Sequence, residues 1–171
     1  MILGERVRLR PWSEADVATL AVLRNDPSLQ SLLLSRVRGS HPDQVRDWLR
    51  QRSASASGML CVVADAADDR ALGWIQLSGL DDPDGRAELG ICLAPDGQGR
   101  GLGREAVSLL VAHAAAGWPL RKVSLRVRAD HARAVRCYEA SGFERCGLLR
   151  ADVFADGAWR DVLLMERLLR G

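Results

Sequence analysis

A glycine-rich segment directly before an amphipathic helix constrains this chain more than any other feature of its sequence. Residues 97–106 read Gly-Gln-Gly-Arg-Gly-Leu-Gly-Arg-Glu-Ala. Glycines allow positive φ and a close approach of backbone to ligand, and a helix N-terminus offers free N–H groups with partial positive charge. The segment therefore predicts a loop that binds a pyrophosphate, with Arg100 and Arg104 adding charge-assisted contacts.

Two other phosphate-binding patterns fit this segment less well. The P-loop needs G-x-x-x-x-G-K-[ST], which the chain lacks, and its only lysine is Lys122. The dinucleotide fingerprint G-x-G-x-x-A fits residues 101–106, and Asp130 follows the next expected strand. That aspartate comes late, the loop from Leu93 to Gly101 is long, and too few strands remain for a doubly wound sheet. An NAD-binding protein stays as a minor alternative.

The helix after the glycines has an apolar stripe, and the other elements follow from similar patterns. The stripe consists of Val107, Leu110, Val111, Ala114 and Ala115, spaced as one face of a helix. Further helices are expected over residues 13–24, with Ser13 and Asp16 as caps, from about Ser40 with Pro42 and Asp43 in its first turn, and over residues 132–141. Strands are expected over residues 7–10, 59–65, 72–80, 86–94, 122–128, 143–154 and 159–168.

The connections between these elements predict the topology. Acidic, Gly- or Pro-containing turns join the three strands of residues 59–94 into an antiparallel meander, and Asp156-Gly157 predicts a hairpin. The strand–helix–strand run over residues 86–128 implies a parallel pair with a right-handed crossover. We expect an α/β fold with a mixed α+β sheet, helices on both faces and the order β-α-α-β-β-β-α-β-α-β-β, as one domain over residues 1–171.

Composition and charge exclude several functional classes. The net charge is +2, and acids are interleaved with the 24 basic residues, so no basic face for nucleic acid is expected. The near absence of lysine is typical of a GC-rich, bacterial-like coding sequence. The N-terminus lacks the pattern of a signal peptide, and the most apolar segment, residues 106–120, is too short and too interrupted for a membrane span. We expect a cytoplasmic protein without a membrane partner.

Cysteine and histidine spacing predicts neither disulfides nor a metal site. The four cysteines contain no C-x-x-C pair, and the three histidines show no H-E-x-x-H spacing. All four cysteines have apolar neighbours, so buried free thiols are expected. They are Cys61, Cys92, Cys137 and Cys146.

Three blocks together resemble the GNAT superfamily of N-acetyltransferases. Gln98, Gly101 and Gly103 match Q/R-x-x-G-x-G/A, and residues 87–93 resemble the family's fourth strand. Residues 131–143 resemble the second signature, N-x-x-A-x-x-x-Y-x-x-x-G-F, with His131 in place of the usual Asn. An imidazole can also donate a hydrogen bond.

The resemblance implies transfer of an acetyl group from acetyl-CoA to a primary amine by direct attack in a ternary complex. It implies that Tyr138 protonates the leaving thiolate, that Glu88 removes the amine proton, and that a backbone N–H near Leu93 polarises the thioester carbonyl. No metal is implied. The residues expected to contact the coenzyme are Ile91, Cys92, Leu93, Gln98, Gly99, Arg100, Gly101, Leu102, Gly103, Arg104, His131, Ala134 and Tyr138.

Each chemical role has a plainer alternative. Tyr138 could be a core aromatic with a satisfied hydroxyl, and Glu88 a solvated strand carboxylate. A covalent acetyl-cysteine on Cys92 or Cys137 is disfavoured, since no His–Asp pair near them would activate a thiol. A non-catalytic acyl-CoA-binding module and transfer of another short acyl group both stay open.

The acceptor is expected at the first two helices and the terminal hairpin. Residues 23–27, Ser40 and 48–49 resemble the branch with ribosomal-protein N-terminal, spermidine and amino-sugar-nucleotide acetyltransferases. A small-molecule or peptide amine is expected, and a homodimer is left open. A polyamine would favour acids, and a sugar nucleotide would need bases. The candidate acids are Asp81, Asp82, Asp84 and Glu88, and the candidate bases are Arg24, Arg36 and Arg38.

Overall fold

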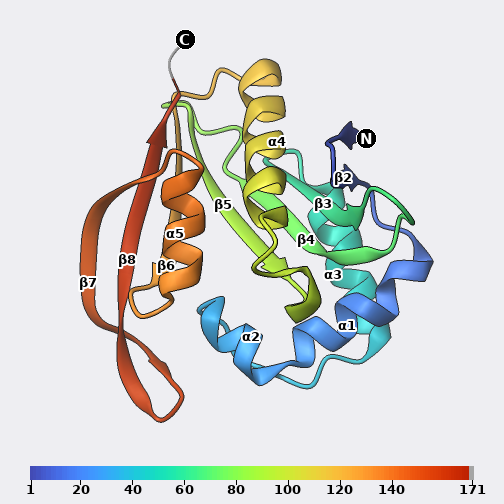
Figure 1. Ribbon diagram of the computed structural model, residues 1–171, viewed down its shortest axis with the longest axis horizontal. Helices are drawn as coiled ribbons and strands as arrows, with labels where there is room; N and C mark the ends of the chain where they lie inside the picture. Colours follow the sequence, from blue (N-terminus) through green and yellow to red (C-terminus); the bar gives the residue numbers. More distant parts are fainter. Residues whose placement is uncertain (170–171) are drawn as a thin grey trace.

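The computed structural model describes residues 1–169, which form an eight-stranded sheet with helices on both faces (Figure 1). The strands are β1 (Ile2–Leu3), β2 (Val7–Arg10), β3 (Gly58–Asp65), β4 (Ala71–Ser78), β5 (Arg86–Leu93), β6 (Lys122–Arg128), β7 (Glu144–Ala155) and β8 (Ala158–Leu168). The helices are α1 (Val17–Asn25), α2 (Pro27–Leu32), α3 (Pro42–Ala54), α4 (Leu102–Gly117) and α5 (Ala132–Ala140), with 3₁₀ turns η1 (Glu14–Asp16) and η2 (Pro95–Gly97).

The strand order is β1-β2-β3-β4-β5-β6-β8-β7, and every neighbouring pair is antiparallel except β5 and β6. The predicted meander, the parallel pair and the terminal hairpin are therefore confirmed. Asp156 and Gly157 both have positive φ, as the tight turn between β7 and β8 requires. The fold class expected from the sequence is thus the one observed.

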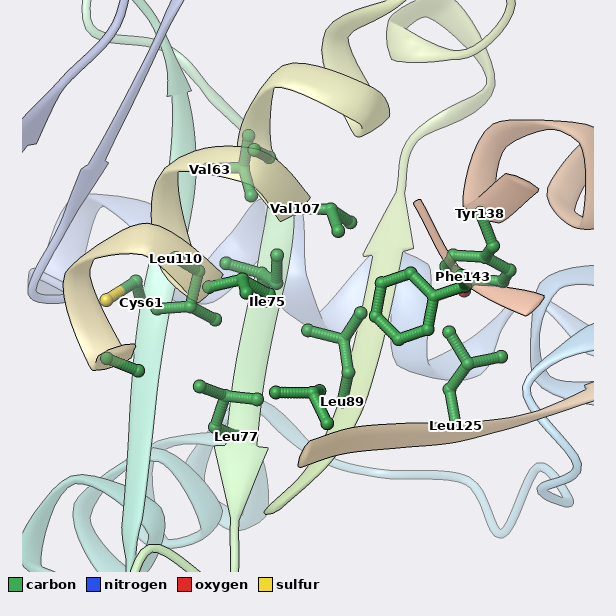
Figure 2. Packing of buried hydrophobic residues seen from close by; sticks show 14 of the residues in the cluster. Cys61, Val63, Ile75, Leu77, Leu89, Val107, Leu110, Leu125, Tyr138 and Phe143 are labelled. Atoms are coloured by element: carbon green, nitrogen blue, oxygen red, sulfur yellow. The ribbon is translucent and has the colours of Figure 1, made fainter. Parts of the chain in front are cut away.

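Two apolar cores lie on opposite faces of this sheet. One, shown in Figure 2, packs α4 and α5 against the strands, with Ile75, Leu89 and Leu110 at its centre. The other packs α1 and α3 against β3 and β4. One stripe position was predicted wrongly: Ala115 is exposed. At 3.6 residues per turn it lies roughly 80° around the helix from Val107, outside the buried face.

The N-terminal helices differ from the prediction in their boundaries. Ser13 and Asp16 form the expected capping box, but it caps η1, which runs on into α1. Asp26-Pro27 ends α1 and also begins α2, a helix that was not predicted, because Asp26 Oδ1 accepts a hydrogen bond from Leu29 N at 2.9 Å. The cap of α3 is His41 rather than Ser40.

The thiols are free, but they are not all buried as expected. Cys61 and Cys92 are buried and Cys137 is half-buried, whereas Cys146 is exposed. Cys146 lies on β7, the last strand of the sheet order, whose residues are mostly solvent-facing. Of the helices in residues 1–169, none has both the length and the apolar character needed to cross a bilayer.

Candidate functional site

The site lies where β5 and β6 separate. Their pairing covers only Arg86–Glu88 against Lys122–Ser124, after which β6 continues to pair with β8. A cavity of about 680 Å³ opens at this divergence. Residues from β5, the glycine loop and the start of α4, α5, and the α1–α3 face all line it. The cavity therefore connects the two faces of the sheet.

The end of β5 directs backbone amides into this opening. Ala94 N donates to Leu72 O at 2.8 Å, so in the antiparallel ladder every second amide of β5 bonds to β4. The amides of Ile91 and Leu93 alternate with these and face away from β4, toward the gap. The predicted N–H near Leu93 thus lies where a carbonyl oxygen in the cavity could accept from it.

The glycine loop has the backbone shape of an anion site. Gly99 and Gly101 have φ of +73° and +78°, and Gly101 caps α4. No atom lies within 4 Å of the place where a Cβ on Gly99 would stand, so the loop is open on that side. The first amides of α4 lack intrahelical acceptors, and Arg104 is exposed beside them. Together these groups suit a pyrophosphate.

An acid in the first turn of α4 would repel such a ligand, but Glu105 is held by a partner that the sequence did not suggest. Its Oε1 accepts from Arg6 N at 2.9 Å and Val7 N at 3.3 Å, and its Oε2 from Arg6 Nε at 3.1 Å. Burial alone would raise the pKa of Glu105, but these bonds lower it. Arg6 Nη1 also donates to Arg100 O at 2.8 Å, which connects the residue before β2 to the loop.

The side chain of Gln98 stabilises the glycine loop through two hydrogen bonds within the protein. Its Nε2 donates to Leu93 O at 2.6 Å, and its Oε1 accepts from Arg133. Both polar atoms of the side chain are therefore used within the protein. Any contact of Gln98 with a coenzyme would involve its backbone.

Tyr138 lies on α5 at the edge of the core and also lines the cavity. Its ring packs edge-to-face on Phe143, with centroids 6.0 Å apart (Figure 2). Within residues 1–169 its hydroxyl has no hydrogen-bond partner, which argues against the satisfied-hydroxyl alternative. Burial raises the pKa of Tyr138, and the neighbouring Cys137 and Cys92 add to this. The phenol therefore keeps its proton at neutral pH and can donate it.

Glu88 lines the cavity from the other face of the sheet. Leu89 and Leu93 of β5 pack in the α4 core, whereas Glu88, alternating with them, faces the α1–α3 side. It is exposed and has no ion pair or hydrogen bond within the described part of the chain. A carboxylate without a structural partner at the mouth of a cavity is free to act as a base.

The thiols near the cavity are unsuited to nucleophilic attack. Burial raises the pKa of Cys92 to about 12, with a smaller contribution from Asp26. Burial likewise raises the pKa of Cys137, although Arg104 opposes the shift. Since the thiolate is the reactive form, these values favour direct transfer over an acetyl-cysteine.

His131 lies at the N-cap of α5 and lines the cavity. Desolvation lowers the pKa of His131, and Arg133 and Arg128 lower it further, so the ring is neutral at pH 7 and can donate one N–H. All expected coenzyme contacts line the cavity except two. Arg100 does not line it, and the side chain of Leu102 is buried in the α4 core.

On the acceptor side, several of the charged residues that were expected to bind the amine substrate do not line the cavity. Asp82 and Asp84 pair with Arg86, and neither lines the cavity. Asp81, Arg36 and Arg38 do not line it either, whereas Arg24 and Glu88 do. The sequence analysis missed Arg52, Gln76 and Trp74. Gln76 could have been found from the alternation of side chains along β4. Every second residue of that strand lies on the face that carries Glu88 of β5, and Gln76 is one of them.

Comparison with known proteins places these features in a family. The model of the "Acetyltransferase (GNAT) domain" matches residues 6–144. A spermidine N(1)-acetyltransferase of Vibrio cholerae is 24% identical over 163 residues, covering 95% of this chain and 93% of that protein. An uncharacterized N-acetyltransferase, p20, of Bacillus licheniformis is 24% identical and covers 97% of this chain and 94% of its own length.

Solved structures agree on the fold. The spermidine N-acetyltransferase from Vibrio cholerae in complex with CoA and spermine superposes with a TM-score of 0.88, at 24% identity and 96% coverage of both chains. A GNAT-family acetyltransferase from Bacillus anthracis gives a TM-score of 0.83 at 16% identity, with 98% of this chain and 97% of that chain covered.

Proposed function

This chain belongs to the acetyltransferase (GNAT) domain family and is an acetyl-CoA-dependent N-acetyltransferase; on that premise we propose how its cavity divides between the two substrates. The α4–α5 side holds acetyl-CoA, and the α1–α3 side admits a small-molecule primary amine. The observation that carries the proposal is the divergence of β5 and β6, which opens a cavity through the sheet between the two sides. The whole chain acts as a single catalytic domain.

The residues on the donor side fit a coenzyme A pyrophosphate. The loop amides at Gly99 and Gly101, the first turn of α4 and Arg104 would hold it, while Arg6 neutralises Glu105 nearby. Acetyl-CoA supplies an acetyl group activated as a thioester. The amides of Ile91 and Leu93 would donate to the carbonyl oxygen of that group and stabilise the negative charge that develops there.

Two side chains move protons. A primary amine with a pKa near ~10.4 is neutral in only roughly one molecule in 2,500 at pH 7, so the ammonium must lose a proton. Glu88 accepts this proton, directly or through water, as the C–N bond forms. Tyr138 donates its proton to the thiolate as the C–S bond breaks. The attacking nitrogen releases its second proton as the amide forms, and this proton returns the tyrosinate to the phenol, so the products are the amide and coenzyme A.

Calorimetry with acetyl-CoA, with NAD as the comparison ligand, tests the donor half of the proposal. We expect micromolar binding of acetyl-CoA and none of NAD, followed by thiol release with a panel of primary amines. If NAD alone bound, the dinucleotide interpretation of the glycine segment would replace this one. If acetyl-CoA bound but no amine gave thiol, the proposal of catalysis would fail.

Replacing Glu88 by glutamine tests the base. We expect kcat/KM for a primary amine to fall about 100-fold at pH 7, because the variant must rely on the rare neutral amine. The deficit should shrink as pH rises toward the amine pKa. The matched control is Glu144→Gln, an exposed carboxylate at the start of β7 that does not line the cavity. Equal activity of the Glu88 variant and the wild type at pH 7 would remove Glu88 from the mechanism.

Replacing Arg6 by alanine tests whether the contacts of Arg6 hold the glycine loop in its shape. Arg6 donates to Arg100 O, lies against Gly101 and pairs with Glu105, so its loss should weaken acetyl-CoA binding about five- to tenfold while kcat at saturation changes little. The side chain is 54% exposed, which limits the effect. The control is Arg145→Ala, 59% exposed and paired with Glu139 outside the cavity. Unchanged acetyl-CoA affinity would show that the loop keeps its shape without the contacts of Arg6.

A further inference from the structure

The acceptor half of the cavity contains an arginine that forms no ion pair with any of residues 1–169. Arg24, in the last turn of α1, lies over the ring of Trp48 with its guanidinium carbon 4.2 Å from the ring centroid. Trp48 in turn packs edge-on against Trp74 of β4, at 5.3 Å between centroids. The Nε of Arg24 is buried and has no hydrogen-bond partner, and within residues 1–169 the side chain forms no ion pair.

A second cation lies close to the first. Arg52, one turn after Trp48 on α3, also lines the cavity and forms no ion pair among the described residues. Desolvation lowers the pKa of Arg24, and repulsion from Arg52 lowers it further. Two guanidinium groups that line one cavity and have no carboxylate partner within residues 1–169 form a site for an anion.

A glutamine of β4 lies on the same face of the sheet as Glu88. Gln76 lies opposite Gly90 on β5, and its Nε2 is 3.4 Å from where a Cβ on Gly90 would stand. Gln76 lines the cavity, and its Oε1 is buried and has no hydrogen-bond partner within residues 1–169. Along the same face, Trp74 and Ser78 flank Gln76, and Ser78 is opposite Glu88. Gln76 therefore lies between the position of Trp74 and that of Glu88 on this face of the sheet.

The charges lining this cavity are unequal. Of residues 1–169, one acid, Glu88, and six arginines line it. Of these, Arg126 is neutralised by Asp152, and Arg104, Arg133 and Arg136 lie on the donor side, on α4 and α5. Arg24 and Arg52 remain on the acceptor side. A molecule with several ammonium groups would meet one carboxylate and two unpaired guanidinium groups there.

We propose that the acceptor is a primary amine that also carries an anionic group, a carboxylate or a phosphate, bound by Arg24 and Arg52. The inference rests on the proposed function and names the substrate class of the same site. The register of β4 and β5 sets the distance between the amine and the anion. Residues i and i+2 on one face of a strand are roughly 7 Å apart, and Ser78, which lies opposite Glu88, is two such steps from Trp74. The amine and the anion are therefore separated by several bonds, as in an ω-amino acid.

The experiment compares acceptors of equal length that differ in one end group. ω-Amino carboxylates of six to ten carbons, the corresponding aminoalkylphosphonates, amino alcohols and diamines are assayed by thiol release from acetyl-CoA. We expect kcat/KM at least tenfold higher for an anionic series than for the amino alcohols, with the diamines lowest. The carboxylate and phosphonate arms tell the two anions apart, and spermidine serves as the polyamine reference.

The variants are Arg24→Gln and Arg52→Gln, with Arg50→Gln as control. Arg50 lies on α3, pairs with Asp47 and does not line the cavity. Each cavity variant should raise KM for the anionic amine about 10- to 100-fold, and leave KM for the amino alcohol and the affinity for acetyl-CoA unchanged. Arg24→Lys should retain part of the preference. Arg52 is exposed, so its variant tests the site even if loss of the Arg24–Trp48 contact disturbs the fold.

The outcomes separate this inference from the proposed function. If spermidine or the diamines react faster than every anionic amine, or if neither cavity variant changes KM for the anionic series, the inference is wrong while amine acetylation stands. If acetyl-CoA binds but no amine releases thiol, the proposed function fails and this inference falls with it. Calorimetric binding of the best ω-amino acid to protein saturated with coenzyme A, lost in Arg24→Gln, supports the site independently of turnover.

Discussion

Replacing Tyr138 by phenylalanine is expected to lower kcat by about 100-fold or more without changing the affinity for acetyl-CoA. The hydroxyl lines the cavity and has no hydrogen-bond partner within residues 1–169, so its removal breaks no internal contact. The ring keeps its packing on Phe143, and the fold should be unaffected. What is lost is the proton for the leaving thiolate.

The measurement is single-turnover kinetics with the best amine, combined with calorimetry of acetyl-CoA. Ser108→Ala removes another hydroxyl, on the exposed side of α4, and should leave both quantities unchanged. A Tyr138 variant with normal kcat and normal coenzyme binding would falsify the assignment of the acid. Weaker coenzyme binding at unchanged kcat would instead make Tyr138 a binding residue.

The pH profile provides a second check on Tyr138. Burial raises its pKa, and loss of the acid should therefore occur above the ordinary tyrosine range near ~10. If Tyr138 is the acid, wild-type kcat should not fall between pH 7 and 9 through its ionisation. The phenylalanine variant should show a low kcat throughout this range, because phenylalanine has no hydroxyl that could donate a proton at any pH.

The sequence predicted the fold well where the signals are local. β3, β4, β5 and β6 were expected within two residues at each end, because strand alternation and turn residues are visible over a few positions. The helix α2 was missed because six residues show little periodicity, and Asp26-Pro27 is as suitable for ending one helix as for beginning another.

The two halves of the site differ in how far the sequence predicted them. On the donor side the glycine loop and the segment around Tyr138 are contiguous motifs, so most of their residues were named in advance. On the acceptor side, Arg24, Gln76 and Glu88 come from α1, β4 and β5, and only packing and sheet register bring them to one cavity. The Arg6–Glu105 contact spans 99 residues and has no local signal.

The second large effect is expected for stability, at a buried ion pair between Arg10 and Asp16. Arg10 of β2 donates from Nη1 and Nη2 to the two oxygens of Asp16, at 2.8 and 2.9 Å, and these side chains are 10% and 4% exposed. Ser13 N and Oγ donate to the same carboxylate at 2.7 and 2.9 Å. Arg10 also bonds to Asp69, so the pair joins β2, the start of α1 and the turn between β3 and β4.

Asp16→Ala should lower the free energy of unfolding by about 3 kcal/mol at pH 7. The substitution leaves a buried guanidinium with only the half-exposed Asp69 as a counter-charge, and removing one partner of a buried pair typically costs ~3–5 kcal/mol. Asp43→Ala, which removes an exposed carboxylate beside Arg46 on α3, should change it by less than ~1 kcal/mol. Urea unfolding of both variants and the wild type measures the difference.

The pH dependence tests whether the charge of Asp16 causes this effect. Burial alone would raise the pKa of Asp16, but the bonds from Arg10 and Ser13 lower it in the folded protein. Its contribution is therefore fully present above the unfolded pKa near ~3.9 and is lost as pH falls through the folded pKa. The gap between wild type and Asp16→Ala should narrow below about pH 4. A gap that stayed constant with pH would mean that lost packing, rather than the ion pair, destabilises the variant.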